Sequence, residues 1–152
     1  MKEIIVILDN IRSALNVGAI FRTCDGVGAK KLYLVGITPY PPHPKVLKTA
    51  LGANESVVYE HVESTANVVN KYKKEGYKVY SLEENKTAKN FFDQDLNHNK
   101  LIFIMGNEIL GVPEEIQKMS DETLFLPMIG KKNSLNVATT TGIVLYNAQF
   151  AR

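Results

Sequence analysis

The chain has 152 residues, 45% of them hydrophobic and 22% charged, and a net charge of +2, which suits one folded domain and excludes a disordered or low-complexity protein. No apolar run approaches the roughly 18 residues that a membrane span requires, and the first residues predict a strand instead of a signal peptide, so we expect a cytoplasmic protein. Cys24 is the only cysteine, which excludes an internal disulfide and a cysteine-based zinc site.

Strands and helices alternate along the sequence. Short apolar runs predict strands at 3–8, 32–36, 56–61, 78–82, 101–105 and 123–128. Helical patterns with cap and stop residues cover 16–27, 64–75, 113–119 and 136–151. Continuous apolar strands separated by helices are typical of a mainly parallel sheet with helices on both faces, so the predicted fold class is α/β. The proline cluster at 39–44 predicts a stiff surface loop, with a polyproline II ligand as the alternative.

Common nucleotide and metal signatures do not fit this sequence. Gly26-Val27-Gly28 ends a predicted helix, whereas a dinucleotide-binding fingerprint opens one. Gly130-Lys131-Lys132 lacks the spacing and the hydroxyl residue of a P-loop. The three histidines are scattered without ligand spacing, so we expect no metal site.

Three clusters place polar residues next to predicted strands and helix starts. In the first, 16–22, Asn16 can cap the helix, and Arg22 is either a snorkelling surface residue or a phosphate clamp. The second, 101–113, is a buried strand followed by a glycine-containing loop, which lets the backbone approach a ligand at the carboxyl edge of the sheet. The third, 126–137, leads from a strand through a loop to a helix start, where Ser134 or Asn136 can be the N-cap.

Together, these clusters resemble the signature motifs of the SpoU/TrmH family within the SPOUT superfamily of RNA methyltransferases. The motifs occur in order: Asn-x-Gly-x-x-x-Arg near the start, Gly-x-Glu-x-x-Gly after the penultimate strand, and Pro-Met-x-Gly-x-x-x-Ser-Leu-Asn-Val before the last helix. The stretch Lys-Thr-Ala-Leu-Gly-Ala at 48–53 is also similar to the family. Two departures, at 139–141 and at Asn147, lie outside the motif positions that carry chemistry.

The resemblance implies an α/β fold with a deep C-terminal trefoil knot, a homodimer, and S-adenosylmethionine as cofactor. It also implies one domain over residues 1–152, without a terminal RNA-binding extension. A neutral adenosine requires apolar walls and backbone hydrogen bonds. The backbone positions that the resemblance assigns to the cofactor are Leu82, Gly106, Leu126, Ile129, Ser134 and Leu135.

The implied reaction is methylation of a ribose 2′-hydroxyl in RNA, with tRNA preferred to rRNA. Arg22, Glu108, Ser134 and Asn136 match the family's site residues. We expect Arg22 to bind a phosphate and to stabilise developing alkoxide charge, because a guanidinium with a pKa above about 12 is a poor general base. Glu108 would orient Arg22 or the loop, and Ser134 would position the hydroxyl. Asn16 and Asn136 would fix the site by hydrogen bonds.

The charges of the chain are segregated. Residues 1–54 carry seven Lys or Arg against three Asp or Glu, residues 55–128 carry eight against thirteen, and residues 129–152 carry three against none. If the basic ends meet in space, they form a positive face that attracts phosphates, although an ordinary solvated surface explains the pattern as well. The candidate contacts to an RNA backbone, besides Arg22, are Lys30, Lys31, Lys45, Lys48, Lys131 and Lys132.

Two other functions are compatible with such a fold. One is a catalytically silent RNA-binding module, against which the intact set of Arg22, Glu108, Ser134 and Asn136 counts. The other is a SPOUT enzyme that methylates an RNA base, which the Ser-Leu-Asn motif disfavours. Analysis of the methylated nucleoside separates these three functions.

Overall fold

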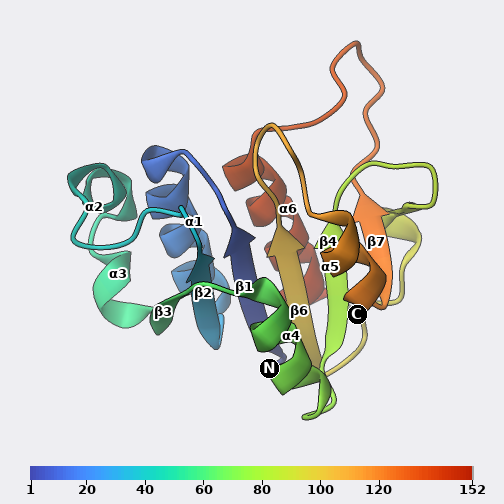
Figure 1. Cartoon of the computed structure of the whole chain (residues 1–152), viewed down its shortest axis with the longest axis horizontal. Helices are drawn as coiled ribbons and strands as arrows, with labels where there is room; N and C mark the ends of the chain where they lie inside the picture. The colour runs from blue at the N-terminus through green and yellow to red at the C-terminus, as the bar shows by residue number, and fades with distance from the viewer. Residues whose placement is uncertain (152) are drawn as a thin grey trace.

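The computed structural model describes residues 1–151, and in this part of the chain seven strands form one sheet with helices on both faces (Figure 1). The strands are β1 (Glu3–Asp9), β2 (Lys31–Val35), β3 (Tyr59–Val62), β4 (Lys78–Leu82), β5 (Lys89–Asn90), β6 (Lys100–Met105) and β7 (Glu122–Phe125). The helices are α1 (Ala14–Val27), α2 (Pro44–Ala50), α3 (Ala53–Ser56), α4 (Thr65–Lys73), α5 (Glu114–Met119) and α6 (Val137–Phe150), with a 3₁₀ turn η1 (Phe91–Asp93).

The sheet has the strand order β3-β2-β1-β6-β4-β7-β5, and all of its pairings are parallel. β1 lies between β2 and β6, so that Val6 is opposite both Leu32 and Phe103. Because every strand runs in the same direction, the segments that follow the strands all emerge at one carboxyl edge. The α/β class predicted from the sequence is confirmed.

β1 shows why its sequence is a continuous apolar run. Ile4, Val6 and Leu8 belong to the core on the side of α1 and α6, whereas Ile5 and Ile7 belong to the core on the side of α4 and α5. All five side chains are fully buried. A strand covered by helices on both faces has no solvent-facing side, and its sequence therefore lacks the alternation of an exposed strand.

Several predicted bounds are corrected by the structure. The helix predicted from Asn16 begins at Ala14, because the Ser13 hydroxyl is the N-cap and accepts a hydrogen bond from the Asn16 N–H. The strand predicted at 56–61 is Tyr59–Val62, because α3 includes Ser56. The strand predicted at 123–128 ends at Phe125, two residues before Pro127, which has no N–H for a sheet hydrogen bond. α2, α3, β5 and η1 were not predicted.

Two long loops lie over the carboxyl edge of β6, β4 and β7. One joins β6 to α5, and the other, drawn in orange to red, rises high above the sheet between β7 and α6 (Figure 1). The knot implied by the resemblance concerns this part of the chain and stays a prediction. Within residues 1–151, no helix combines the length and apolarity that crossing a membrane requires.

Candidate functional site

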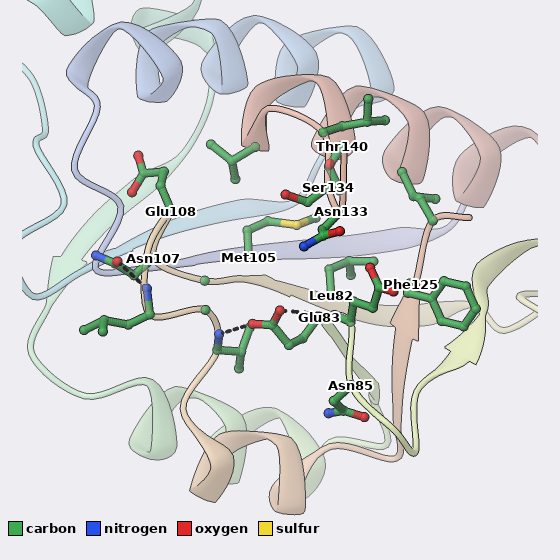
Figure 2. Close-up of a pocket in the computed structure, with 18 of the residues that line it drawn as sticks. Leu82, Glu83, Asn85, Met105, Asn107, Glu108, Phe125, Asn133, Ser134 and Thr140 are labelled. Atoms are coloured by element: carbon green, nitrogen blue, oxygen red, sulfur yellow. Dashed lines mark hydrogen bonds between the residues drawn. The ribbon is translucent and has the colours of Figure 1, made fainter. Parts of the chain in front are cut away.

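The segments that follow β4, β6 and β7 enclose a pocket of about 1030 Å³ at the carboxyl edge of the sheet, and the start of α6 forms one wall (Figure 2). Its apolar lining comes from the ends of three strands and from the loop before α6. The lining includes Leu82, Met105, Val112, Leu124, Leu126 and Leu135. The second and third sequence clusters therefore meet at one pocket, together with Asn16 of the first cluster.

The charged groups of this pocket are carboxylates, and we call it the carboxylate pocket. Glu83, Glu84 and Glu108 line it, and among the described residues no Lys or Arg does. Such a lining is unsuited to a polyphosphate, and it suits a ligand that is apolar in part and neutral or cationic elsewhere. Within residues 1–151, no group of His, Cys, Asp or Glu is arranged to hold a metal ion.

The loop after β6 is held in shape by Asn107. Its Oδ1 accepts hydrogen bonds of 2.9 Å from the N–H groups of Ile109 and Leu110, and its Nδ2 donates one of 2.7 Å to the carbonyl of Asn10. The Gly111 N–H closes the turn on the Asn107 carbonyl at 2.8 Å. A Cβ at Gly106 would collide with the backbone of Gly111, so the loop can fold back on itself only with glycine there.

Glu83, the residue directly after β4, holds the same loop by hydrogen bonds. Its carboxylate accepts hydrogen bonds from the N–H groups of Val112, at 2.8 Å, and Glu84, at 3.1 Å (Figure 2). Gly111 has a φ of +73°, and a Cβ there would collide with the Glu83 carboxylate. We did not predict Glu83 or Asn107 from the sequence. The sequence feature that could have identified them is a polar residue one or two positions after a buried strand, at the carboxyl edge of the sheet.

Glu108 binds the start of α1 and not Arg22. Its carboxylate accepts hydrogen bonds from the N–H groups of Arg12, at 2.8 Å, and Ser13, at 3.0 Å. A negative charge at a helix N-terminus is favourable, because the N–H groups there point outward. Arg22 lies nine residues after Ser13, which is about 13 Å along a helix. Glu108 was predicted to orient either Arg22 or the loop. Its contacts within this chain match the second role.

Asn16 and Asn136 contact each other across the pocket wall. Asn136 is the N-cap of α6, because its Oδ1 accepts hydrogen bonds from the N–H groups of Ala138 and Thr139. Its Nδ2 donates a hydrogen bond of 3.3 Å to Oδ1 of Asn16 in the first turn of α1. Ser134, two residues before the cap, lines the same pocket above Met105 (Figure 2).

The six backbone positions predicted for the cofactor do not all meet at this pocket. Ile129 lies in the loop between β7 and α6, with a fully exposed side chain, and it does not line the pocket. That loop rises away from the sheet edge between β7 and α6 (Figure 1). The positions that do line the pocket are Leu82, Gly106, Leu126, Ser134 and Leu135.

Arg22 lies in a second groove, of about 920 Å³, which we call the Arg22 groove. It is lined by Arg22 and Thr23 of α1, Lys48 and Thr49 of α2, and Tyr146 of α6. α2 crosses α1 closely, because Gly18 has no Cβ that would collide with Thr49. Arg22 does not line the carboxylate pocket, so one chain alone does not place Arg22 beside Ser134 or Asn136.

The predicted RNA-contacting lysines fall into separate places. Lys30 and Lys31 lie at the start of β2, at the edge of the sheet opposite the pocket. Nζ of Lys31 is 2.7 Å from Oε1 of Glu60, an ion pair that raises the pKa of Lys31 and lowers that of Glu60. Nζ of Lys30 is 3.5 Å from Oε1 of Glu3. Lys30 and Lys31 therefore do not share one positive face with residues at the carboxyl edge of a single chain.

The remaining lysines lie closer to the candidate site. Lys45 and Lys48 are on α2, and Lys48 lines the Arg22 groove. Lys131 and Lys132 are exposed in the loop between β7 and α6, just before Asn133, which lines the pocket.

Comparison with known proteins identifies relatives along nearly the whole chain. The model of the SpoU rRNA methylase family matches residues 3–146. The chain is 34% identical over 155 residues to the tRNA (guanosine(18)-2′-O)-methyltransferase of Aquifex aeolicus, with 99% of this chain and 71% of the relative covered. It is 30% identical over 151 residues to the enzyme of the same name from Thermus thermophilus, with 99% and 76% covered.

Solved structures of other proteins also resemble this chain over nearly its whole length. The structure of an AdoMet-bound rRNA methyltransferase from Sinorhizobium meliloti superposes with a TM-score of 0.90 at 28% identity. The similarity covers 97% of this chain and 56% of that protein, so this chain spans little more than half of the Sinorhizobium enzyme.

Proposed function

The chain belongs to the SpoU rRNA methylase family, and we propose that it transfers the methyl group of S-adenosylmethionine to a ribose 2′-hydroxyl of tRNA. The observation that carries this proposal is the pocket at the carboxyl edge, in which the second and third sequence clusters meet Asn16 of the first. The relatives from Aquifex and Thermus are named as tRNA 2′-O-methyltransferases, which favours tRNA as the substrate. We place the reaction in the cytoplasm.

The residues of the pocket fit S-adenosylmethionine. Leu82, Leu126 and Leu135 supply the apolar contacts that an adenine ring requires, and the neighbouring carboxylates are favourable for a cationic sulfonium. S-adenosylmethionine held by these residues would supply a methyl group activated as a sulfonium for transfer to the ribose oxygen, and the hydroxyl proton would pass to solvent. The protein's task is to hold the hydroxyl in line with the methyl group and to exclude water.

The site residues divide this task. Arg22 binds the phosphate next to the target ribose and stabilises the negative charge that develops on the ribose oxygen. Ser134 accepts or donates a hydrogen bond that positions the hydroxyl. The Asn16–Asn136 hydrogen bond fixes the start of α6 against α1, which sets the position of Ser134 two residues earlier. Glu108 holds the loop after β6 against α1.

We propose that the active unit is a homodimer in which Arg22 of one protomer faces the cofactor pocket of its partner. The support is the separation of the two halves of the site, because Arg22 lines a groove formed by α1, α2 and α6 and does not line the pocket. A dimer that places this groove over the pocket of the other protomer completes the site without any rearrangement of α1.

Methyl transfer to RNA tests the function. The purified chain is incubated with S-adenosylmethionine labelled in the methyl group and with tRNA or rRNA, and the RNA is digested to nucleosides. We expect a 2′-O-methylnucleoside from tRNA. A methylated base would instead identify a base methyltransferase. Binding without methyl transfer to either RNA would identify an RNA-binding module.

A further inference from the structure

The proline cluster at 39–44 holds an exposed aromatic side chain that the proposed chemistry does not use. Tyr40 stacks on His61 of β3, with ring centroids 4.2 Å apart and ring planes inclined by 25°. His61 covers one face of the Tyr40 ring, and yet Tyr40 remains 45% exposed. An aromatic ring that is backed on one side and open to solvent on the other is suited to stacking with another planar group.

The position of this ring is fixed from both sides. Nε2 of His61 donates a hydrogen bond of 2.8 Å to the carbonyl of Gly36, at the start of the loop that contains Tyr40. The Ile37 N–H donates one of 3.0 Å to Oδ1 of Asn10, and the His43 N–H donates one of 3.1 Å to the Tyr40 carbonyl. The loop therefore has little conformational freedom to lose when a ligand binds.

The surroundings of Tyr40 favour a polyanion. The loop leads directly into α2, which carries Lys45 and Lys48, and Lys48 lines the Arg22 groove. One carboxylate lies beside the stack, because Oε1 of Glu63 is 3.9 Å from Nδ1 of His61. A path from the Arg22 groove along α2 to Tyr40 thus offers cations for phosphates and then an open aromatic ring. Single-stranded RNA is recognised by this combination of cationic contacts and aromatic stacking.

We propose that the Tyr40–His61 pair is a stacking platform for an unpaired base of the RNA substrate. This inference rests on the proposed function in one respect, because it requires the chain to bind RNA. Tyr40 lines neither the carboxylate pocket nor the Arg22 groove. The base on Tyr40 therefore belongs to a nucleotide other than the one that is methylated, and the platform selects RNA with an unpaired nucleotide near the target.

A tryptophan reporter tests the platform directly, because the chain has no tryptophan of its own. In Tyr40→Trp, the single indole takes the place of the proposed stacking ring, and we expect tRNA to quench its fluorescence. Phe92→Trp is the matched control, since Phe92 is 57% exposed on η1, next to β5 at the other end of the sheet. Equal responses of the two variants, or no response at tRNA concentrations that saturate methyl transfer, would overturn the platform.

Kinetics separate stacking from a structural role. We expect Tyr40→Ala to raise the KM for tRNA by about five- to a hundredfold, while the KM for S-adenosylmethionine and the Tm stay near those of the native chain. Tyr40→Phe keeps the ring and should restore the native KM. Because stacking releases no counterions, Tyr40→Ala should leave the salt dependence of RNA binding unchanged, whereas Lys48→Ala should reduce its slope by about 0.7–0.9.

The two proposals fail in distinguishable ways. If the native chain methylates tRNA and Tyr40→Ala has an unchanged KM for tRNA, or Tyr40→Phe is as impaired as Tyr40→Ala, the platform is wrong and the proposed function stands. If the native chain transfers no methyl group but Tyr40→Trp alone responds to tRNA, the platform stands and the methyltransferase proposal fails. If the Tyr40→Trp signal changes with protein concentration without RNA, the ring contacts a second copy of the chain, and the platform is wrong.

Discussion

Glu83 and Glu108, the two carboxylates with hydrogen bonds at the candidate site, both bind backbone N–H groups. Glu83 accepts from Val112 at 2.8 Å, and Glu108 accepts from Arg12 at 2.8 Å and from Ser13 at 3.0 Å. Hydrogen bonds to a charged group contribute more than those between neutral groups, about 1.5–3 kcal/mol when shielded from water and less at an exposed site such as Glu108. These side chains therefore shape the pocket, and in the proposed function the chemistry belongs to Arg22 and Ser134.

A substitution of Arg22 separates chemistry from cofactor binding. Because Arg22 lies outside the carboxylate pocket, we expect Arg22→Ala to lose methyl transfer by about a hundredfold or more while it binds S-adenosylmethionine as the native chain does. Arg22→Lys should retain a little activity if charge is sufficient, and none if a planar, two-pronged grip on phosphate is required. Calorimetric titration with the cofactor is the measurement, and much weaker binding by Arg22→Ala would contradict this assignment.

Cys24 reports on the integrity of α1 because it is the only cysteine. Its side chain is fully buried among the core residues of α1, and burial raises the pKa of the thiol to about 12. The reactive thiolate is therefore scarce at pH 8. We expect iodoacetamide to leave the folded protein unmodified at pH 8 and to add one group once urea unfolds it, as followed by intact mass. Rapid alkylation without urea would show that α1 opens readily.

At the scale of the elements, the crossing of α1 and α2 depends on Gly18. A Cβ at this position would collide with the Val46 carbonyl oxygen and with Oγ1 of Thr49, which donates a hydrogen bond of 2.7 Å to the Leu15 carbonyl. Alanine in place of glycine inside a helix normally stabilises a protein by about 1 kcal/mol, whereas overpacking costs about 1–3 kcal/mol. The backbone atom in the collision cannot move aside cheaply, so the collision should dominate.

We therefore expect Gly18→Ala to lower the free energy of unfolding by about 1–2 kcal/mol. Gly142→Ala in α6 is the matched control, because a Cβ built there meets no atom of residues 1–151 within 4 Å apart from its own stretch of helix. That variant should gain the usual helix propensity and be slightly more stable. Urea unfolding of both variants is the measurement. A Gly18→Ala variant as stable as Gly142→Ala would mean that α2 moves away from α1 without cost.

Whether an element could be predicted from the sequence depends on how strongly burial, length and capping residues mark it. β1 and β6 were predicted because strands buried on both faces must be apolar throughout. α2 was missed because its start overlaps the proline cluster, where Pro44 occupies the first turn, and because the helix is only seven residues long. Asn16 was predicted as the N-cap of α1, whereas the cap is Ser13, whose side chain can accept the same kind of hydrogen bond.

At the scale of the whole molecule, the parallel sheet decides which sequence neighbours share a surface. Its carboxyl edge brings the second and third clusters and Asn16 of the first to one pocket, so this part of the site was predictable from the order of strands and loops. The same rule places Lys30 and Lys31 at the opposite edge, because they lie at the start of β2, although they belong to the basic N-terminal part of the chain. Charge counted along the sequence carries no information on which edge of the sheet a residue occupies. The predicted positive face therefore included lysines that lie at different edges.

The composite site predicts complementation between two inactive variants. In the proposed dimer, Arg22 of one protomer acts on a methyl group held near Ser134 of its partner. Arg22→Ala and Ser134→Ala homodimers should each be inactive, because both of their sites lack one residue. In a mixed dimer, one site lacks both residues and the other has both intact. Arg22 and Ser134 are exposed, so neither variant should lose core packing or fail to fold.

Mixed dimers are made by refolding the two variants together, with a tag on one chain to confirm that subunits have exchanged. With random pairing about half of the dimers are mixed, and each has one intact site, so activity should return to roughly a quarter of that of the native dimer. Each variant refolded alone is the control and should stay inactive. If tagged, verified mixed dimers transfer no methyl group, then Arg22 and Ser134 serve the same site within one chain. α1 would then have to move toward the carboxylate pocket during the reaction, because the two residues line different cavities in the structure.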